Sequence, residues 1–252
     1  MRDFTSAWSK WERAETHIAE FNRERIAFLD KNPCVVRAQY NAETAHTDYI
    51  VEHVEKVPAT ISLVVGDAVH NLRSSLDHIA AALVDKSTTQ SGFPIFKDSD
   101  AFNAGFAGKT KGMSALDQER IWFIKPHLCG SNTLWGLHRL DIADKHHLLI
   151  AYTQCAGAVE HRFDETDVIT ANGIPMPLPR KIALPLLGKL PIPECGKVVV
   201  SYPGNPEENK NIKPLFDIAF GDVPVFKYWL IGKALTEMAK EVERIYLAFT
   251  KT

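Results

Sequence analysis

The sequence predicts a mainly helical α+β protein, built as a four-helix bundle and decorated with a β-hairpin at 33–58 and a small β-rich insertion at 150–222. Two observations lead to this fold class. Several long stretches repeat apolar residues every three or four positions, as amphipathic helices do, and short β-branched runs bounded by turn residues lie between them. Since 45% of the 252 residues are hydrophobic, we expect a single domain over 1–252 with a substantial core.

The first predicted helix runs from Phe4 to Phe28, where aromatic and aliphatic residues recur at helical spacing between Lys, Arg and Glu. It should end before Pro33, because the residue that precedes a proline disfavours helical backbone. The two β-branched runs that follow predict a hairpin over 35–57.

Five further segments complete the prediction. The apolar residues of 61–86 fall within a narrow arc of a helical wheel, which predicts a second long helix. The segment 92–112 has turn residues and no period, so we expect a loop over the core. Short helices should follow around 115–124 and 133–149, and a last helix should open at Asp222 and continue in a strict three-four pattern.

Charge and cysteine content narrow the function classes. Lys and Arg number 29 against 31 Asp and Glu, so the formal net charge of -2 provides no global field for nucleic acid or anionic lipid, and any RNA contact must be local. The four cysteines are far apart and form no CxxC pair, which favours reduced thiols. With no signal-like or membrane-length apolar run, we expect a cytoplasmic protein without membrane contact.

Reactive side chains gather in the second predicted helix, in the stretch GDAVHNLRSSLDHIA at 66–80. One interpretation is a solvated helix surface in which Arg73 and Asp77, four residues apart, form an ordinary salt bridge. With Leu72 at the centre of the apolar face, the other half of the wheel carries Asp67, His70, Asn71, Arg73, Ser74, Asp77 and His78.

A second unusual stretch, LWGLHRLDIADKHHLL, interrupts a leucine row with Asp141 and Asp144. A buried ionised carboxylate costs several kcal/mol unless it is paired, so its partners must come from a neighbouring helix. We therefore expect this helix to face the one at 61–86, with Asp141 or Asp144 orienting His78 or holding Arg73.

The run Arg73-Ser-Ser-Leu-Asp-His78 is similar to the Arg-x4-His motif of HEPN domains, which are helical-bundle proteins and in many cases metal-independent ribonucleases of toxin and antiviral systems. The wider pattern GDAVHNLRSSLDH, FPIF and DKHH also resembles a group of bacterial proteins of unassigned function. The HEPN resemblance implies an endoribonuclease without a cofactor, in which His78 is the acid/base and Arg73 holds the scissile phosphate. We expect four residues to support this site: Asn71, Ser74, Asp141 and Asp144.

The same resemblance implies partners. In a regular helix Arg73 and His78 point about 140° apart, so one chain alone aims them poorly. HEPN nucleases pair two motifs across a dimer, which makes a symmetric homodimer an expected corollary here. RNA is the implied substrate, and a toxin of this type would have an antitoxin or other regulatory partner.

Two alternatives stay open. The chain could be a non-catalytic binding or regulatory protein that keeps the helical bundle and its dimer. It could also be a metal-dependent enzyme, because carboxylates and imidazoles spaced along helices suit a divalent ion such as zinc, iron or manganese. The ligand candidates in that case are Asp67, His70, Asp77, Asp144 and His146.

Overall fold

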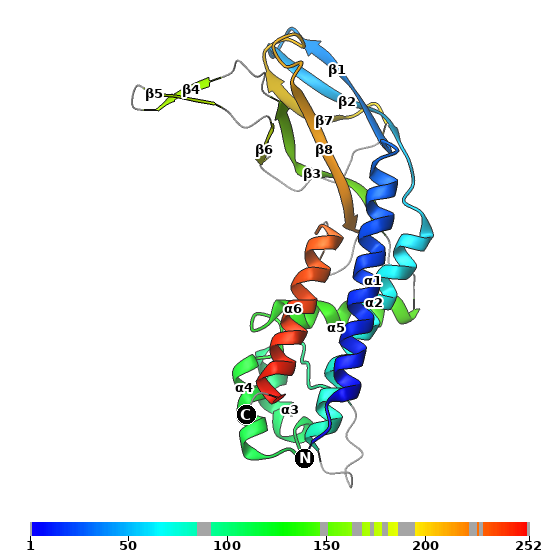
Figure 1. Ribbon diagram of the computed structural model, residues 1–252, viewed down its shortest axis with the longest axis vertical. Coiled ribbons are helices and arrows are strands. Elements are labelled where there is room, and N and C mark those ends of the chain that lie inside the picture. The colour runs from blue at the N-terminus through cyan, green and yellow to red at the C-terminus, as the bar shows by residue number, and fades with distance from the viewer. Residues whose placement is uncertain are drawn as a thin grey trace. The chain divides into compact units, whose positions relative to one another are not determined.

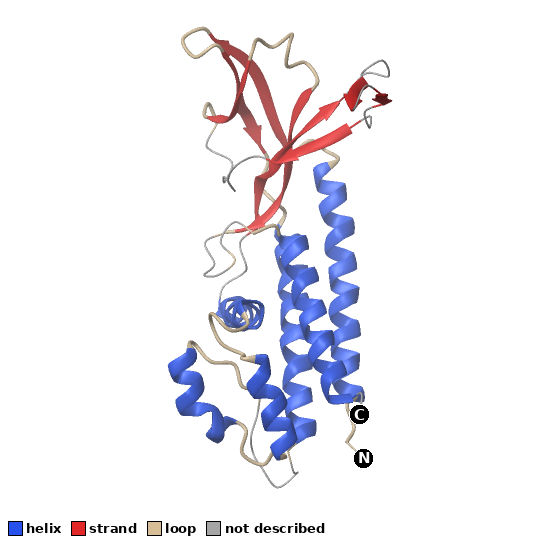
Figure 2. Ribbon diagram, turned by 90° about the vertical axis from the view of Figure 1, so that its left-hand side faces the viewer, coloured by secondary structure: helices blue, strands red, loops and turns tan. Residues whose placement is uncertain are grey.

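The computed structural model describes a mainly helical α+β protein (Figures 1 and 2). It covers residues 2–84, 92–146, 151–162, 168–171, 174–177, 181–185, 195–221, 226 and 229–250, with the backbone alone at 146 and from 151 to 185. Six helices lie in this described part: α1 (Thr5–Leu29), α2 (Ala59–Leu83), α3 (Ser99–Lys109), α4 (Ala115–Ile124), α5 (Asn132–His146) and α6 (Ile231–Thr250).

The strands form three small sheets in the orders β1-β2-β7, β6-β3-β8 and β4-β5. Antiparallel pairing joins β1 to β2 as a hairpin and also joins β2 to β7. The strand bounds are β1 (Cys34–Asn41), β2 (His46–Val54), β3 (Ala151–Arg162), β4 (Val168–Ala171), β5 (Ile174–Pro177), β6 (Lys181–Pro185), β7 (Val198–Pro203) and β8 (Ile212–Phe220).

The chain divides into two compact units. The helical unit comprises Met1–Glu24, Pro58–Ile150 and Phe220–Thr252, and the β unit comprises Arg25–Val57 and Ala151–Ala219. The hairpin and the insertion, predicted as separate decorations of one domain, therefore belong to the same unit. The pairing of β2 with β7 joins them, as between Tyr49 and Val200.

The helical unit has its core along α2. In Figures 1 and 2, α1, α2 and α6 run side by side and α5 crosses them, so a four-helix bundle is not confirmed. Trp11 of α1 donates a hydrogen bond from Nε1 to the carbonyl of Ala239 (3.0 Å), and Ser75 of α2 donates one to the carbonyl of Ala7 (2.8 Å). Side chains at most 1% exposed in this core include Phe21, Ile61, Leu72, Leu76, Ile79, Leu134, Leu137 and Leu140.

The prediction of a loop over 92–112 is wrong, because α3 lies within it. Asp98 caps this helix by accepting the N–H of Ala101 at Oδ1 (2.8 Å). Its one buried side chain, Phe102, contacts the rings of Phe96 and Trp122, with centroids 5.5 and 4.8 Å away. Tertiary aromatic packing, which has no local period, stabilises the helix.

The helix expected to open at Asp222 begins instead at Ile231. Trp229 lies before the helix, where its N–H donates to the carbonyl of Phe226 and its carbonyl accepts from Phe220. Asp222 itself lies outside the described residues. Within the described part, none of the helices has the length and apolar character needed to cross a membrane.

The close packing of α5 in the helical unit can be tested at Gly136. A Cβ added to Gly136 of α5 would overlap the ring of Phe226, which is 3% exposed. We expect Gly136→Ala to destabilise the protein by about 2 kcal/mol, because the buried ring has little room to move. Urea unfolding followed by circular dichroism measures the change.

Gly108→Ala in α3 is the matched control, since nothing lies within 4 Å of the added Cβ. There alanine should stabilise by up to about 1 kcal/mol through helix propensity. Equal stabilities for the two variants would contradict the close approach at Gly136.

Candidate functional site

The residues expected to form one site lie on two different faces of α2. Asn71 and His78, seven residues apart, differ by only about 20° around the helix and lie toward α1. His70 is rotated from His78 by about 80° and lies toward α5. The geometry of the two faces decides what each can do.

On the face toward α5, a buried carboxylate orients an exposed imidazole. Asp141 is 3% exposed, and its Oδ1 lies 3.0 Å from Nδ1 of His70, whose side chain is 50% exposed. Lys145 donates to the other oxygen, Oδ2, at 2.7 Å. The second ring nitrogen of His70 lies 3.4 Å from Oγ of Ser74. The expectation that a neighbouring helix provides a partner for Asp141 is met, but that partner is His70 rather than Arg73 or His78.

Arg73 is committed to a structural role. Its side chain is buried and forms the expected i,i+4 ion pair with Asp77, while Nη2 donates to the carbonyl of Phe93 (3.1 Å). The N–H of Phe93 in turn donates to Oδ1 of Asp77 (2.7 Å). These bonds tie α2 to the segment that precedes α3, so the guanidinium is not free to bind a phosphate.

His138 of α5 is a site residue that was not predicted from the sequence, and it lies near enough to Arg73 and Asp77 for their charges to affect its pKa. Its Nδ1 is buried and has no hydrogen-bond partner among the described residues. Burial lowers the pKa of His138 below its usual value, and the charges of Arg73 and Arg139 lower it further against the opposing effects of Asp141 and Asp77. The sequence could have indicated His138 only through its position beside the leucine row that contains Asp141.

On the face toward α1, α2 lines a cavity of about 440 Å³. Its described lining residues include no carboxylate and are Ser6, Ser9, Lys10 and Arg13 of α1 with Asn71 and His78 of α2. Lys10 donates from Nζ to Oδ1 of Asn71 (3.4 Å), and in the described part of the chain neither Lys10 nor Arg13 forms an ion pair. Within the described part of the chain, an imidazole and two cations without an ion pair therefore share a cavity that no carboxylate lines.

Lys10 and Arg13 were missed because charged residues on the outer face of an amphipathic helix follow the same pattern whether or not they line a cavity. Only the packing of α1 on α2 distinguishes the two cases. Ser74, Asp141 and Asp144, expected to support His78, belong to the other face or to α5.

The candidate metal ligands are held in separate arrangements. Asp67 is exposed, His70 and Asp77 bind Asp141 and Arg73, and the carboxylate of Asp144 lies against the backbone of α2 at Gly66. Over the residues that the structure describes, no group of three His, Cys, Asp or Glu side chains is placed to hold a metal ion. The side chain of His146 lies outside the described residues.

Comparisons of this chain with protein-family models, with curated protein sequences and with solved structures found no match. The two faces of α2 therefore provide the structural basis for a function. The face toward α1 combines a cavity with a titratable group and with two cations that form no ion pair within the described part of the chain.

The Asp141 cluster predicts a measurable stability effect. Asp141→Asn removes the charge that holds His70 and Lys145, and we expect it to destabilise the protein by about 1–2 kcal/mol. The loss should stay moderate because both partner side chains are about half exposed, which lets water replace the lost contacts. Asp67→Asn, the same change at an exposed position of α2, should shift the unfolding free energy by less than about 0.5 kcal/mol. Similar effects in chemical denaturation would contradict the role of Asp141.

The lowered pKa of His138 predicts a pH effect. As the pH falls below 6.5, the unfolded chain binds a proton at this imidazole that the folded protein does not bind, so stability decreases. Well above 6.5 the imidazole is neutral in both states and the effect vanishes. We expect the unfolding free energy to fall between about pH 7.5 and about pH 5.5, and to fall less in His138→Leu. Parallel pH profiles for the two proteins would argue against a buried neutral His138.

Proposed function

We propose that this protein is a metal-independent endoribonuclease that uses His78 in the cavity between α1 and α2. The observation that carries the proposal is the lining of that cavity, where His78 lies with Lys10 and Arg13 and where no described carboxylate takes part. Such a lining favours a polyanion through local positive charge, although the whole chain has a formal net charge of -2. The substrate would be RNA in the cytoplasm.

The chemistry requires a base, an acid and a cation. Neutral His78 removes the proton from a ribose 2′-hydroxyl, the resulting oxygen attacks the adjacent phosphorus, and the 5′-oxygen leaves with a proton to give a 2′,3′-cyclic phosphate. Lys10 and Arg13 stabilise the charge that develops on the phosphoryl oxygens. They replace Arg73, which the HEPN resemblance implied for this role, because the Arg73 guanidinium is buried with Asp77 and the Phe93 carbonyl.

A second proton-transfer group must protonate the leaving 5′-oxygen. His78 is the only imidazole that lines this cavity within the described residues. A symmetric homodimer that brings two copies of α1 and α2 together would provide the second His78, as the HEPN resemblance implies. The proposal therefore includes a dimer whose interface runs along these two helices.

The decisive experiment measures cleavage of total RNA by the purified protein in excess EDTA. We expect His78→Ala to lower the rate at least about 100-fold, because the base is lost. The double variant Lys10→Gln/Arg13→Gln should lower it by about tenfold or more, with a weaker dependence on salt concentration. His53→Ala, an exposed histidine in the β unit, is the matched control and should cleave normally.

Equal cleavage by the wild type and by His78→Ala would contradict the proposal. RNA that stays intact but is bound, with binding lost in Lys10→Gln/Arg13→Gln, would favour the alternative of a non-catalytic binding protein. Circular dichroism and sedimentation of each variant show that folding and dimer formation are retained.

A further inference from the structure

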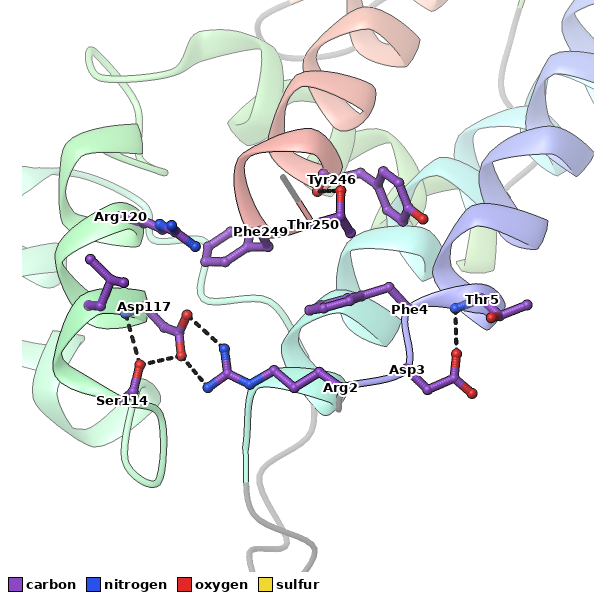
Figure 3. Close-up of a pocket in the computed structure, with 11 residues that line it drawn as sticks. Arg2, Asp3, Phe4, Thr5, Ser114, Asp117, Arg120, Tyr246, Phe249 and Thr250 are labelled. Atoms are coloured by element: carbon purple, nitrogen blue, oxygen red, sulfur yellow. Dashed lines mark hydrogen bonds and ion pairs between the residues drawn. The ribbon is translucent and has the colours of Figure 1, made fainter. Parts of the chain in front are cut away.

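A larger cavity, of about 910 Å³, lies in the helical unit where the start of α1, α4 and the end of α6 come together (Figure 3). Its volume falls in the range of pockets that hold small organic ligands. The described residues that line it all differ from those that line the cavity of His78. The function proposed above therefore does not account for it.

Much of the wall is aromatic. Phe4 comes from the segment before α1, and Tyr246 and Phe249 come from the last turns of α6. Phe4 and Tyr246 meet edge to face, with centroids 6.4 Å apart and planes at 83°. Leu116 of α4 adds an apolar side chain that is 54% exposed. These walls favour a flat apolar body, since rings bind well against other rings at stacked or edge contacts.

One acidic group of the cavity is already neutralised. Asp117 accepts two hydrogen bonds from Arg2, at 2.9 and 2.6 Å, and one from the hydroxyl of Ser114 at 2.5 Å (Figure 3). Burial alone would raise the pKa of Asp117, but Arg2 and Ser114 outweigh burial and lower it. The carboxylate is therefore ionised at neutral pH and fully paired, so it does not repel an anionic ligand strongly.

Arg120 provides the uncommitted charge. Its guanidinium carbon lies 5.9 Å from the centroid of the Phe249 ring, and in the described residues it forms no ion pair. Figure 3 shows Arg120 beside Phe249, whereas Asp3 lies at the other end of the cavity, beyond Phe4. Asp3 is itself engaged, because it accepts the N–H of Thr5 at 2.8 Å.

We propose that this cavity binds a small planar aromatic anion, with the ring against Phe4 and Phe249 and the acidic group on Arg120. A guanidinium can bind a carboxylate or a phosphate through two parallel hydrogen bonds, and its contact with Phe249 holds it at the wall. Both an aromatic carboxylate and a nucleoside monophosphate have this chemistry. The experiment distinguishes these two sources.

Isothermal titration with three probes tests the proposal: 1-naphthoate, AMP and the uncharged nucleoside adenosine. We expect at least one of the two anions to bind the wild type with a Kd below about 1 mM, and adenosine to bind at least about tenfold more weakly than AMP. Tighter binding of 1-naphthoate identifies an aromatic acid as the ligand, and tighter binding of AMP identifies a nucleotide. Failure of both anions to bind overturns the proposal.

Variants place the bound anion. Arg120→Gln should weaken anion binding at least about tenfold, and Arg120→Lys should restore part of it. Arg244→Gln is the matched control, because Arg244 lies on the same helix as Phe249 but pairs with Glu241 outside the cavity, and its variant should bind normally. Anion binding that survives Arg120→Gln and disappears in Lys10→Gln/Arg13→Gln would assign the ligand to the α1–α2 cavity and overturn the proposal. Because binding is measured without RNA, this outcome is independent of nuclease activity.

Discussion

The rotation of α2 about its own axis is the constraint on which the arrangement of the helical unit depends. Its apolar residues Ile61, Val65, Leu72, Leu76 and Ile79 are all at most 1% exposed, so any other rotation would expose a large apolar area. Helix geometry then leaves no freedom in where the polar residues between them lie. The burial of the apolar stripe therefore fixes which side chains face α1 and which face α5.

This constraint separates the chemistry of GDAVHNLRSSLDHIA into two kinds. Toward α5, Asp141 binds His70 across the contact between the two helices and helps to align them. Arg73 pairs with Asp77 on α2 itself and donates to the carbonyl of Phe93. Toward α1, His78 and its neighbouring cations have no carboxylate partner among the residues that the structure describes. A charged group that lines a cavity without an ion-pair partner is the better candidate to bind a ligand, because a ligand of opposite charge can offset its charge.

The long helices could be predicted from the sequence because their apolar periodicity is local and strong, as in α1 and α2. The helix α3 could not, since the ring contacts of Phe102 come from residues distant in the chain. Pairing of β2 with β7 joins strands about 150 residues apart, which no local pattern specifies. At the site, the need of Asp141 for a partner on another helix was predictable from its place in a leucine row. Asp141 contacts His70 rather than Arg73 or His78 because of how far α5 is rotated and shifted along α2, which the sequence does not specify.

A nearly neutral chain can still present strong local fields when its carboxylates are used internally. Arg2 binds the largely buried carboxylate of Asp117, and Arg25 binds that of Asp217. Each such pair leaves one carboxylate fewer that could pair with the remaining cations. Lys10 and Arg13 near His78, and Arg120 near Phe249, are left without such a partner in the described part of the chain. The formal net charge of -2 counts the paired cations and the unpaired cations alike. Anion binding by this protein therefore has to be argued from which cations are paired, because their total number carries no such information.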